Sequence, residues 1–352
     1  MDFTAITTPC VEPFLLSEAS RSSAAPPPSF LARRQLLRQL CNIAALGSAP
    51  AIGGSLLAHA TAAVAQTASP LSAASSNSVR LVTVGGALTE MVYALKLEHL
   101  LVGTDTTSLY PAAAQHTAKV GYMRQLSAEG VLSLKPTALV ATTEAGPPVV
   151  LDQLRSAGVR IEHIKADHTW DEVRRKLEAL GRVLGHTEAA TALWHTLDAE
   201  WTRTQQRVAQ HTQARAAAGH KPPRILFLLA HSGTPQASGE GTAADALIRF
   251  IGGRNAMSGA YGFKGYKPLT PESMAAAAPE IILTTTQGLA AVGGESALWQ
   301  RPELRLTPAY AQRQQGRLWH KDALELLGFG PRMPALVAAL AQQVSGLSGG
   351  AA

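Results

Sequence analysis

The sequence predicts an α/β fold in which two Rossmann-like lobes are joined by a long, rigid helix. Three observations lead to this prediction. Short apolar strands alternate with helical segments in both halves of the 352-residue chain, a pattern typical of parallel sheets. Between the halves, residues 169–215 favour helix almost throughout. Each half also contains a glutamate, a short helix, a proline and an apolar strand in the same order.

The first 65 residues are predicted to be an export signal. Residues 33–38 give a charged start with paired arginines, and an Ala/Leu/Gly-rich stretch without Asp, Glu, Lys or Arg follows at about 40–65. Small residues end this stretch, so cleavage is expected after Ala65. The layout resembles a twin-arginine signal, with an ordinary secretory signal as the alternative. The mature protein would begin at residue 66 and reside in the periplasm.

The cysteine content and the charge argue against several classes of protein. Cys10 and Cys41 both lie in the predicted signal, so the mature chain has no disulfide, thiolate metal site or cysteine nucleophile. Residues 38–40 lack the small side chains expected before a lipid-attachment cysteine. The net charge of +6 is scattered and aromatic residues make up 5% of the chain, which gives nucleic-acid binding no support.

The first lobe is expected over residues 79–168, after a flexible tether at residues 66–78. Its opening strand is a β-branched run closed by Gly85 and Gly86, and a helical pattern follows. The predicted strands of this lobe are residues 80–84, 100–103, 138–141 and 160–165. The predicted helices are residues 88–95, 127–134 and 149–157.

The middle of the chain, residues 169–215, is predicted to be helical and to contain the connecting helix. A break is expected near Gly185. The second piece, from Thr187 to about Gln213, carries apolar residues mostly at intervals of three and four. At 1.5 Å per residue this piece would span roughly 40 Å, which is longer than a helix packed within one small lobe needs. It is therefore expected to join the lobes.

The second lobe is expected over residues 222–346, after a linker that contains Gly, Pro and Lys. Its predicted strands are residues 224–230, 281–285 and 317–320, and its predicted helices are residues 243–251 and 333–344. The repeated unit links the two lobes. Glu129 and Glu272 each begin a predicted helix, and a proline follows seven residues later, just before an apolar strand. This repetition indicates two lobes of similar design.

The segment from Gly121 to Gly130 carries the strongest indication of function. Tyr122 stands two residues before Arg124, on a segment that leads into a predicted helix. A phenol binds a metal well after it loses its proton, and its ordinary pKa is about 10. A neighbouring guanidinium favours the phenolate, whose oxygen suits ferric iron, including haem iron. The pair is therefore a candidate iron site, with a packed loop tyrosine beside a solvated arginine as the plain alternative.

The chain resembles the periplasmic haem-binding proteins of bacterial haem ABC importers, which are substrate-binding proteins of the helical-backbone class. The motifs that carry the resemblance occur in family order at residues 80–95, 105–108, 121–136, 146–148, 241–245, 266–269 and 327–330. Together they cover about residues 79–345. The resemblance implies a ligand cleft between the two lobes, haem b as the transported ligand, and no enzymatic activity.

The resemblance also implies roles for individual residues. Tyr122 matches the axial tyrosine of the family, and Arg124 matches the arginine that hydrogen-bonds to the phenolate. His231 ends the first predicted strand of the second lobe. Some family members use a histidine of this lobe as the opposing ligand, in some cases with a second, stacked haem. A strand-end histidine bonded to backbone is the plain alternative for His231.

The partners follow from the same resemblance. Glu129 and Glu272 resemble the paired acids, one on each lobe, by which such proteins dock on permease arginines. A carboxylate at the start of a helix also interacts favourably with the helix dipole, and the two roles are compatible. The expected partners are hemin and an inner-membrane haem ABC permease with its ATPase, and the protein is expected to be a monomer.

Other polar residues are weaker candidates for the ligand site. Tyr110 is the rival tyrosine; it has no nearby arginine and either lines the cleft or packs. Arg332, Lys264 and Lys267 are expected in loops of the second lobe, either meeting haem propionates or remaining solvated. Four histidines lack a spacing that converges on a metal and are expected at the surface: His116, His168, His195 and His211.

Carriers of other ligands and a hydrolase are the alternatives to a haem carrier. A carrier of the same architecture for a corrinoid or a ferric siderophore is the alternative, but neither ligand requires the Tyr-x-Arg pair. A zinc or manganese carrier would need several converging His and carboxylate ligands. A secreted hydrolase would need a nucleophile such as Ser232 beside His231, but the flanking glycines of a nucleophile elbow are missing and no phosphate-binding loop appears.

Overall fold

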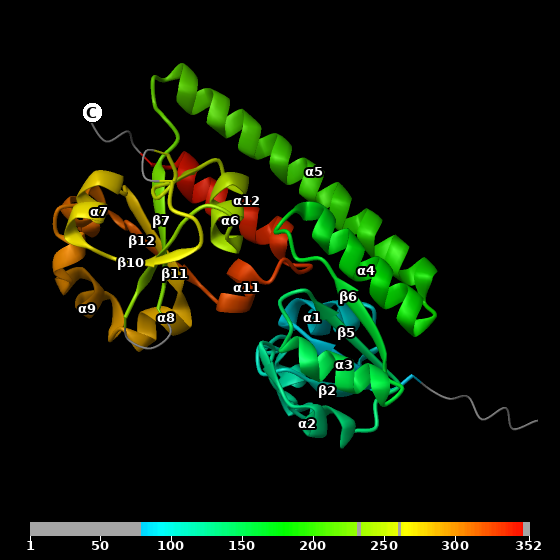
Figure 1. Cartoon of the computed structure of the whole chain (residues 1–352). Helices are drawn as coiled ribbons and strands as arrows, with labels where there is room; N and C mark the ends of the chain where they lie inside the picture. The colour runs from blue at the N-terminus through cyan, green and yellow to red at the C-terminus, as the bar shows by residue number, and fades with distance from the viewer. Residues whose placement is uncertain (1–78, 231–233, 260–261, 348–352) are drawn as a thin grey trace, which may run out of the picture. The chain divides into compact units, whose positions relative to one another are not determined.

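The computed structural model describes residues 79–230, 234–259 and 262–347. The described chain forms two α/β lobes connected through long helices (Figure 1). The predicted export signal and tether, residues 1–78, lie outside the described residues. The domain limits drawn from the sequence remain predictions.

The first lobe is built on a four-stranded parallel sheet ordered β2-β1-β5-β6. Its strands are β1 (Leu81–Val84), β2 (Leu101–Thr104), β5 (Ala138–Thr142) and β6 (Arg160–Ile164). Its helical segments are α1 (Gly86–Ala94), α2 (Ala128–Leu132) and α3 (Pro148–Ser156), with 3-10 turns at Glu98–Leu100 and Ala112–His116. The predicted alternation of strands and helices is confirmed in this lobe. Strands β1 and β5 are buried at every residue, as expected for a parallel sheet covered on both faces.

Two long helices follow, α4 (Trp170–Leu184) and α5 (Thr187–Ala217). Gly185 ends α4 in the left-handed conformation, with φ of 73°, which glycine adopts without a steric penalty. The predicted break is therefore confirmed. Helix α5 has 31 residues, so it is roughly 47 Å long, and it ends four residues later than the sequence pattern indicated. Stacking of Trp170 on Trp201, with ring centroids 4.6 Å apart, holds α4 against α5.

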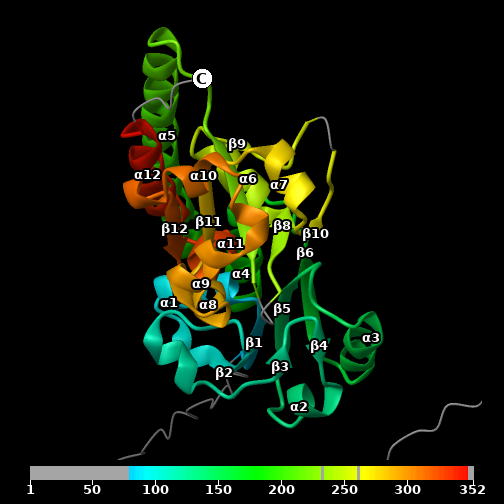
Figure 2. The same cartoon turned by 90° about the vertical axis from the view of Figure 1, so that its left-hand side faces the viewer.

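The second lobe contains a six-stranded sheet ordered β10-β8-β7-β11-β12, with β9 beside β7. The strands are β7 (Arg224–Leu229), β8 (Gln236–Ser238), β9 (Arg254–Asn255), β10 (Tyr266–Pro268), β11 (Ile281–Thr285) and β12 (Leu318–Lys321). Strands β7, β9, β11 and β12 run parallel, as the alternation of strands and helices predicted, whereas β8 runs antiparallel to both β7 and β10 (Figure 2). The short β8 and β10 lack the apolar run that marked the buried parallel strands.

The helices of the second lobe include several that the sequence pattern did not reveal. They are α6 (Ala243–Phe250), α7 (Pro271–Ala277), α8 (Thr286–Ala291), α9 (Gly294–Gln300), α10 (Pro308–Ala311), α11 (Ala323–Leu327) and α12 (Met333–Ser345). Short 3-10 turns lie at Pro302–Leu304 and Arg313–Gln315. Helices α8, α9, α10 and α11 were not predicted, because segments of four to seven residues are too short to show a helical period.

The buried apolar side chains form three clusters. Successive residues of a strand point to opposite faces of the sheet. Val82 accordingly belongs to a cluster within the first lobe, and Leu226 to a cluster within the second. The largest cluster joins both lobes to the long helices, through Leu81 of β1, Leu177 of α4, Trp201 of α5, Phe227 of β7 and Leu340 of α12. The lobes therefore share one continuous apolar core with α4, α5 and α12.

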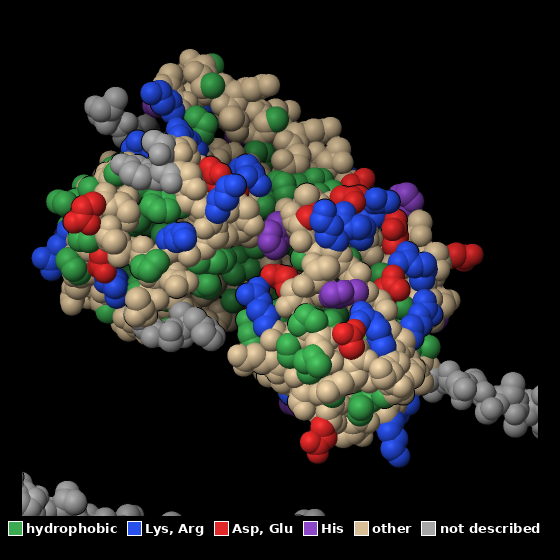
Figure 3. Space-filling model, viewed as in Figure 1, with side chains coloured by type: hydrophobic (Ala, Val, Ile, Leu, Met, Phe, Trp, Pro, Cys, Tyr) green, Lys and Arg blue, Asp and Glu red, His purple; other side chains and the backbone are tan. Residues whose placement is uncertain are grey.

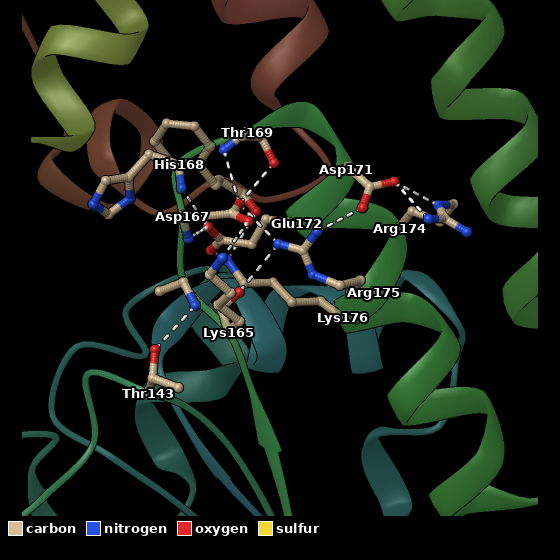
Figure 4. Close-up of polar contacts among 12 residues, drawn as sticks. Thr143, Lys165, Asp167, His168, Thr169, Asp171, Glu172, Arg174, Arg175 and Lys176 are labelled. Atoms are coloured by element: carbon tan, nitrogen blue, oxygen red, sulfur yellow. Dashed lines mark hydrogen bonds and ion pairs between the residues drawn. The ribbon is translucent and has the colours of Figure 1, made fainter. Parts of the chain in front are cut away.

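Buried charges add a polar tie between α4 and the segment before α12. The Lys176 ammonium lies 2.7 Å from a carboxylate oxygen of Glu172. The two side chains are only 2% and 3% exposed. The ammonium also donates to the carbonyl oxygens of Gly328 and Phe329, at 3.0 and 3.2 Å. Glu172 accepts two backbone N–H groups from the turn before α4 (Figure 4). Such a pair is stable because every charge has several partners.

On the face seen in Figure 3, acidic and basic side chains are interspersed and do not form a large patch of one sign. In the part of the chain that the structure describes, none of the helices has both the length and the apolar content required to cross a membrane.

Candidate ligand-binding site

The predicted ligand residues of the first lobe lie beyond the carboxyl ends of its parallel strands. Strand β2 ends at Thr104, and the following loop leads to Tyr122. Strand β5 ends at Thr142, two residues before Glu144. In open α/β sheets, ligands bind outside this edge of the sheet. The topology therefore brings Tyr122 and Glu144 to the edge where a ligand is expected.

Tyr122 is presented on a two-stranded antiparallel hairpin made of β3 (Gly121–Tyr122) and β4 (Gln125–Leu126). Leu126 is buried and anchors the hairpin, while Gly121 has φ of +100°, a conformation that favours glycine. Tyr122 is 43% exposed, one of the exposed large apolar residues of the described chain. The phenol is therefore accessible to a ligand. The structure does not record any interaction that would tie it into the interior of the described lobe.

The hairpin is bonded to the loop between β5 and α3. The backbone N–H of Leu126 donates to the carbonyl oxygen of Gly146, and the N–H of Gly146 donates to the carbonyl of Met123, each at 2.9 Å. These bonds place Arg124 beside Glu144, whose carboxylate accepts a hydrogen bond of 2.6 Å from the guanidinium. Sequence analysis did not single out Glu144. The expected hydrogen bond from Arg124 to the Tyr122 oxygen stays a prediction.

Tyr266 approaches this pair from the second lobe. Burial raises its pKa, the Glu144 carboxylate raises it further, and the Arg124 guanidinium lowers it. Both charges influence the phenol because they lie near it. Tyr266 is half-buried on the edge strand β10. Its phenol is therefore neutral near pH 7 and able to donate a hydrogen bond.

The two tyrosines occupy matching positions in the two lobes. Each directly follows a glycine with positive φ, Gly121 at +100° and Gly265 at +69°. Each precedes a short helix that is capped by a hydroxyl side chain and has a glutamate in its first turn. The repeated unit found in the sequence thus begins earlier than Glu129 and Glu272. It includes Tyr122 and Tyr266, a correspondence hidden by a difference of one residue in spacing.

Tyr110 has an arginine neighbour, contrary to the sequence-based expectation. The Arg332 guanidinium carbon lies 3.9 Å from the centre of the Tyr110 ring, a cation–π contact. Arg332 directly precedes α12 and donates two hydrogen bonds to Glu90 of α1. It is therefore an ion-paired residue rather than a solvated loop charge. Burial raises the pKa of Glu90, and the bonds from Arg332 act in the opposite direction.

A dense set of hydrogen bonds supports the loop that carries Tyr110. The buried Asp105 carboxylate accepts bonds from the backbone N–H of Gly85 and from the Ser108 hydroxyl, each at 2.9 Å. The Lys119 ammonium donates to the Thr104 hydroxyl at 2.8 Å and to two carbonyl oxygens at 3.0 Å. Burial lowers the pKa of Lys119, and Asp105 opposes this effect. The loop is thus a defined structure, and it fixes where Tyr110 is presented.

The remaining candidates fall in different places. Glu129 and Glu272 are exposed in the first turns of α2 and α7. His231 and Ser232 lie outside the described residues. Lys264 and Lys267 are exposed, with Lys267 in β10 rather than in a loop. His168 is half-buried against Phe329, with ring centroids 5.4 Å apart, so it packs on a neighbour as well as meeting solvent. Across the described parts of the chain, groups of three or more His, Cys, Asp or Glu suited to a metal ion are absent.

Comparison with known proteins gives consistent matches. The sequence matches the periplasmic binding protein family over residues 81–316. The fold is similar to that of the periplasmic heme-binding protein BhuT in complex with two hemes, with 44% identity, a TM-score of 0.69, and coverage of 76% of this chain and 98% of that chain. It is also similar to the periplasmic heme-binding protein RhuT from Roseiflexus sp. RS-1 in apo form, with 36% identity, a TM-score of 0.69, and the same two coverages.

Curated sequences give a more distant set of relatives. The vitamin B12-binding protein of Pectobacterium atrosepticum is 25% identical over 181 residues, which cover 51% of this chain and 62% of that protein. The chain spans less than two thirds of the length of the first curated relatives that it matches.

Proposed function

This chain belongs to the periplasmic binding protein family, and we propose that its ligand is haem, taken up as hemin and delivered to an inner-membrane ABC permease and its ATPase. The observation that carries the proposal is the exposed phenol of Tyr122, two residues from Arg124, at the carboxyl edge of the first sheet. The similarity to structures titled as heme-binding proteins supports the same ligand.

The proposed binding chemistry is the bond between phenolate and ferric iron. Tyr122 loses its proton and coordinates the iron, while Arg124 donates a hydrogen bond to the coordinated oxygen and offsets its charge. His231 is the proposed opposing ligand, from the second lobe. Tyr110 offers a flat aromatic face to the porphyrin, and Arg332, held by Glu90, keeps that ring in place.

The proposed setting is the periplasm, reached by an export signal that is removed near Ala65. Glu129 and Glu272 are the proposed docking groups for the permease, because both carboxylates are exposed and one lies on each lobe. The protein acts as a carrier in this proposal, and haem b is its cargo rather than a catalytic cofactor.

The test is a titration of the exported protein with hemin, followed by visible absorption. The wild type should give a saturable spectrum and a defined stoichiometry. Tyr122→Ala should lose most of the affinity and change the spectrum, because it removes the iron ligand. Tyr110→Ala is the comparison: it removes the aromatic face proposed to contact the porphyrin, so it should weaken binding but keep the form of the spectrum, because the iron ligand remains. An unchanged spectrum and affinity in Tyr122→Ala would show that the ligand assignment is wrong.

A corrinoid or ferric-siderophore carrier is the second candidate. The names of the curated relatives favour a corrinoid. Parallel titrations with cobalamin and with a ferric siderophore distinguish these ligands from hemin. Saturable binding of cobalamin that persists in Tyr122→Ala, without binding of hemin, would establish this alternative.

A further inference from the structure

Arg124 and Glu144 form an ion pair at the hairpin that carries Tyr122, and both of their charges act on the pKa of Tyr266. The Arg124 to Glu144 ion pair is 2.6 Å long, with 57% and 37% of the two side chains exposed. Arg124 lies on the hairpin that presents Tyr122, and Glu144 lies on the loop that is bonded to this hairpin. Tyr266 comes from the other lobe. The proposed function gives Arg124 a role but gives none to Glu144 or Tyr266.

The guanidinium of Arg124 has two candidate anionic acceptors: one that it contacts in the fold and one that lies two residues away in the sequence. One is the Glu144 carboxylate, which it binds in the structure. The other is the Tyr122 phenolate, once that oxygen coordinates iron. A guanidinium is a rigid fork of five N–H donors, so its orientation toward one acceptor restricts its geometry toward the other. A fixed carboxylate also disfavours a second negative charge nearby. Glu144 therefore weakens the contribution that Arg124 makes to iron binding.

We propose that Glu144 is a positioning residue that sets how readily the protein releases haem, by competing with Tyr122 for the guanidinium of Arg124. This inference rests on the proposed function of the site. When haem is bound, Arg124 turns toward the phenolate. When haem leaves, the guanidinium forms its ion pair with Glu144 again. The carboxylate thus favours the released state, as a carrier that must deliver its cargo requires.

Tyr266 completes the exchange. The Glu144 side chain is 37% exposed, so water solvates part of its charge when the guanidinium leaves, and a protein donor can supply a further hydrogen bond. The phenol of Tyr266 is neutral and is close enough to feel the Glu144 charge. It donates a hydrogen bond to Glu144 when Arg124 turns away. The second lobe therefore supplies the replacement donor, and the exchange leaves no charge without a partner.

The first experiment measures hemin dissociation, by transfer from the loaded protein to an excess of apomyoglobin in a stopped-flow spectrometer. Glu144→Gln keeps the shape and one acceptor oxygen of the side chain but removes the competing charge. We expect dissociation to slow about 1.5-fold to fivefold, the range that corresponds to a partly exposed ion pair. The visible spectrum should keep the wild-type form, because Tyr122 remains the ligand. Glu144→Asp should restore a rate near that of the wild type.

The matched control is Glu162→Gln. Glu162 of β6, in the same lobe as Glu144, forms an ion pair of the same length, 2.6 Å, with Arg182 of α4. The control makes the same change in net charge without touching the hairpin, so its dissociation rate should equal that of the wild type. Equal slowing in both variants would overturn the proposal, because it would indicate a general effect of charge on an anionic ligand.

Two further variants test the competition itself. Tyr266→Phe removes the replacement donor, so Arg124 should stay on Glu144 and dissociation should become faster. In an Arg124→Ala background, Glu144→Gln should have no further effect. A rate that is unchanged or faster in Glu144→Gln, with hemin binding intact in the wild type, would overturn this inference alone. Failure of the wild type to bind hemin would overturn the proposed function and this inference with it.

Discussion

Arg332 donates two hydrogen bonds, each 3.0 Å long, to the two carboxylate oxygens of Glu90. The pair joins the residue that precedes α12 to α1 of the first lobe, across 242 positions of sequence. Glu90 is 6% exposed in its side chain and Arg332 is 25% exposed. The same guanidinium lies over the Tyr110 ring. Arg332 therefore connects the segment before α12 both to Glu90 in the first lobe and to Tyr110, a candidate ligand residue.

Arg332→Met should destabilise the protein by about 3 kcal/mol, because it leaves a buried carboxylate without its cation. Urea denaturation of the wild type and the variant measures the difference. Arg155→Met is the control, since Arg155 forms an exposed pair with Asp152, at 2.6 Å, and should change the unfolding free energy little. Equal effects of the two substitutions would contradict the role of the Glu90 pair.

Lys176→Met should be at least as costly, about 3–5 kcal/mol, because Glu172 would remain buried with no cation. The carbonyl oxygens of Gly328 and Phe329 would also lose their shared donor. The double variant Lys176→Met with Glu172→Gln removes both charges and should recover part of the loss. The measurement is again the free energy of unfolding in urea. A single variant as stable as the wild type would show that the buried pair is not needed.

Asp167 should make the stability depend on pH in the acid range. Burial would raise its pKa, but hydrogen bonds from Thr169 and Arg175 outweigh burial and lower it. A carboxylate with a lowered folded pKa stabilises the protein above its unfolded pKa, about 3.9, and this stabilisation is lost as the pH falls through the folded pKa. Asp167→Asn should therefore be less stable than the wild type at pH 5–7. Urea denaturation should show this difference shrinking below pH 4, and a difference independent of pH would contradict the assignment.

Glu129→Lys and Glu272→Lys should each weaken productive contact with the permease without weakening hemin binding. Reversing a charge at a docking contact places like charges together, and we expect the protein concentration that half-saturates permease ATPase activity to rise on the order of tenfold. Permease in proteoliposomes provides the assay. Glu188→Lys is the control, since Glu188 is also an exposed acid in the first turn of a helix. An equal effect from Glu188→Lys would point to net charge instead of a docking role.

The sequence predicted the parts of the fold that depend on local pattern. The strands Ala138–Thr142 and Ile281–Thr285 each begin with an apolar run and are buried at every residue. Gly185 marks the end of α4 through its own backbone freedom. The sequence did not predict β8 or β10. Those strands have three residues each, and they form because a neighbouring strand is available for pairing rather than because of their own composition.

The candidate site could be predicted in part for the same reason. Tyr122 and Arg124 are two residues apart, so their chemistry is visible in one segment of sequence. Glu144 reaches Arg124 through hydrogen bonds between a hairpin and a distant loop, which no local pattern reports. Tyr266 belongs to the other lobe. The partnership of Tyr110 with Arg332 likewise depends on packing between remote parts of the chain.

The continuous apolar core shared by the two lobes has a consequence for how a permease recognises the loaded carrier. Leu81, Leu177 and Phe227 belong to one packed cluster, so a wide swing of one lobe would have to open it to water. Full and empty carriers should therefore look nearly alike in outline. A permease that receives this protein would have to distinguish them by small displacements at the rim of the binding site, rather than by a jaw-like closing motion.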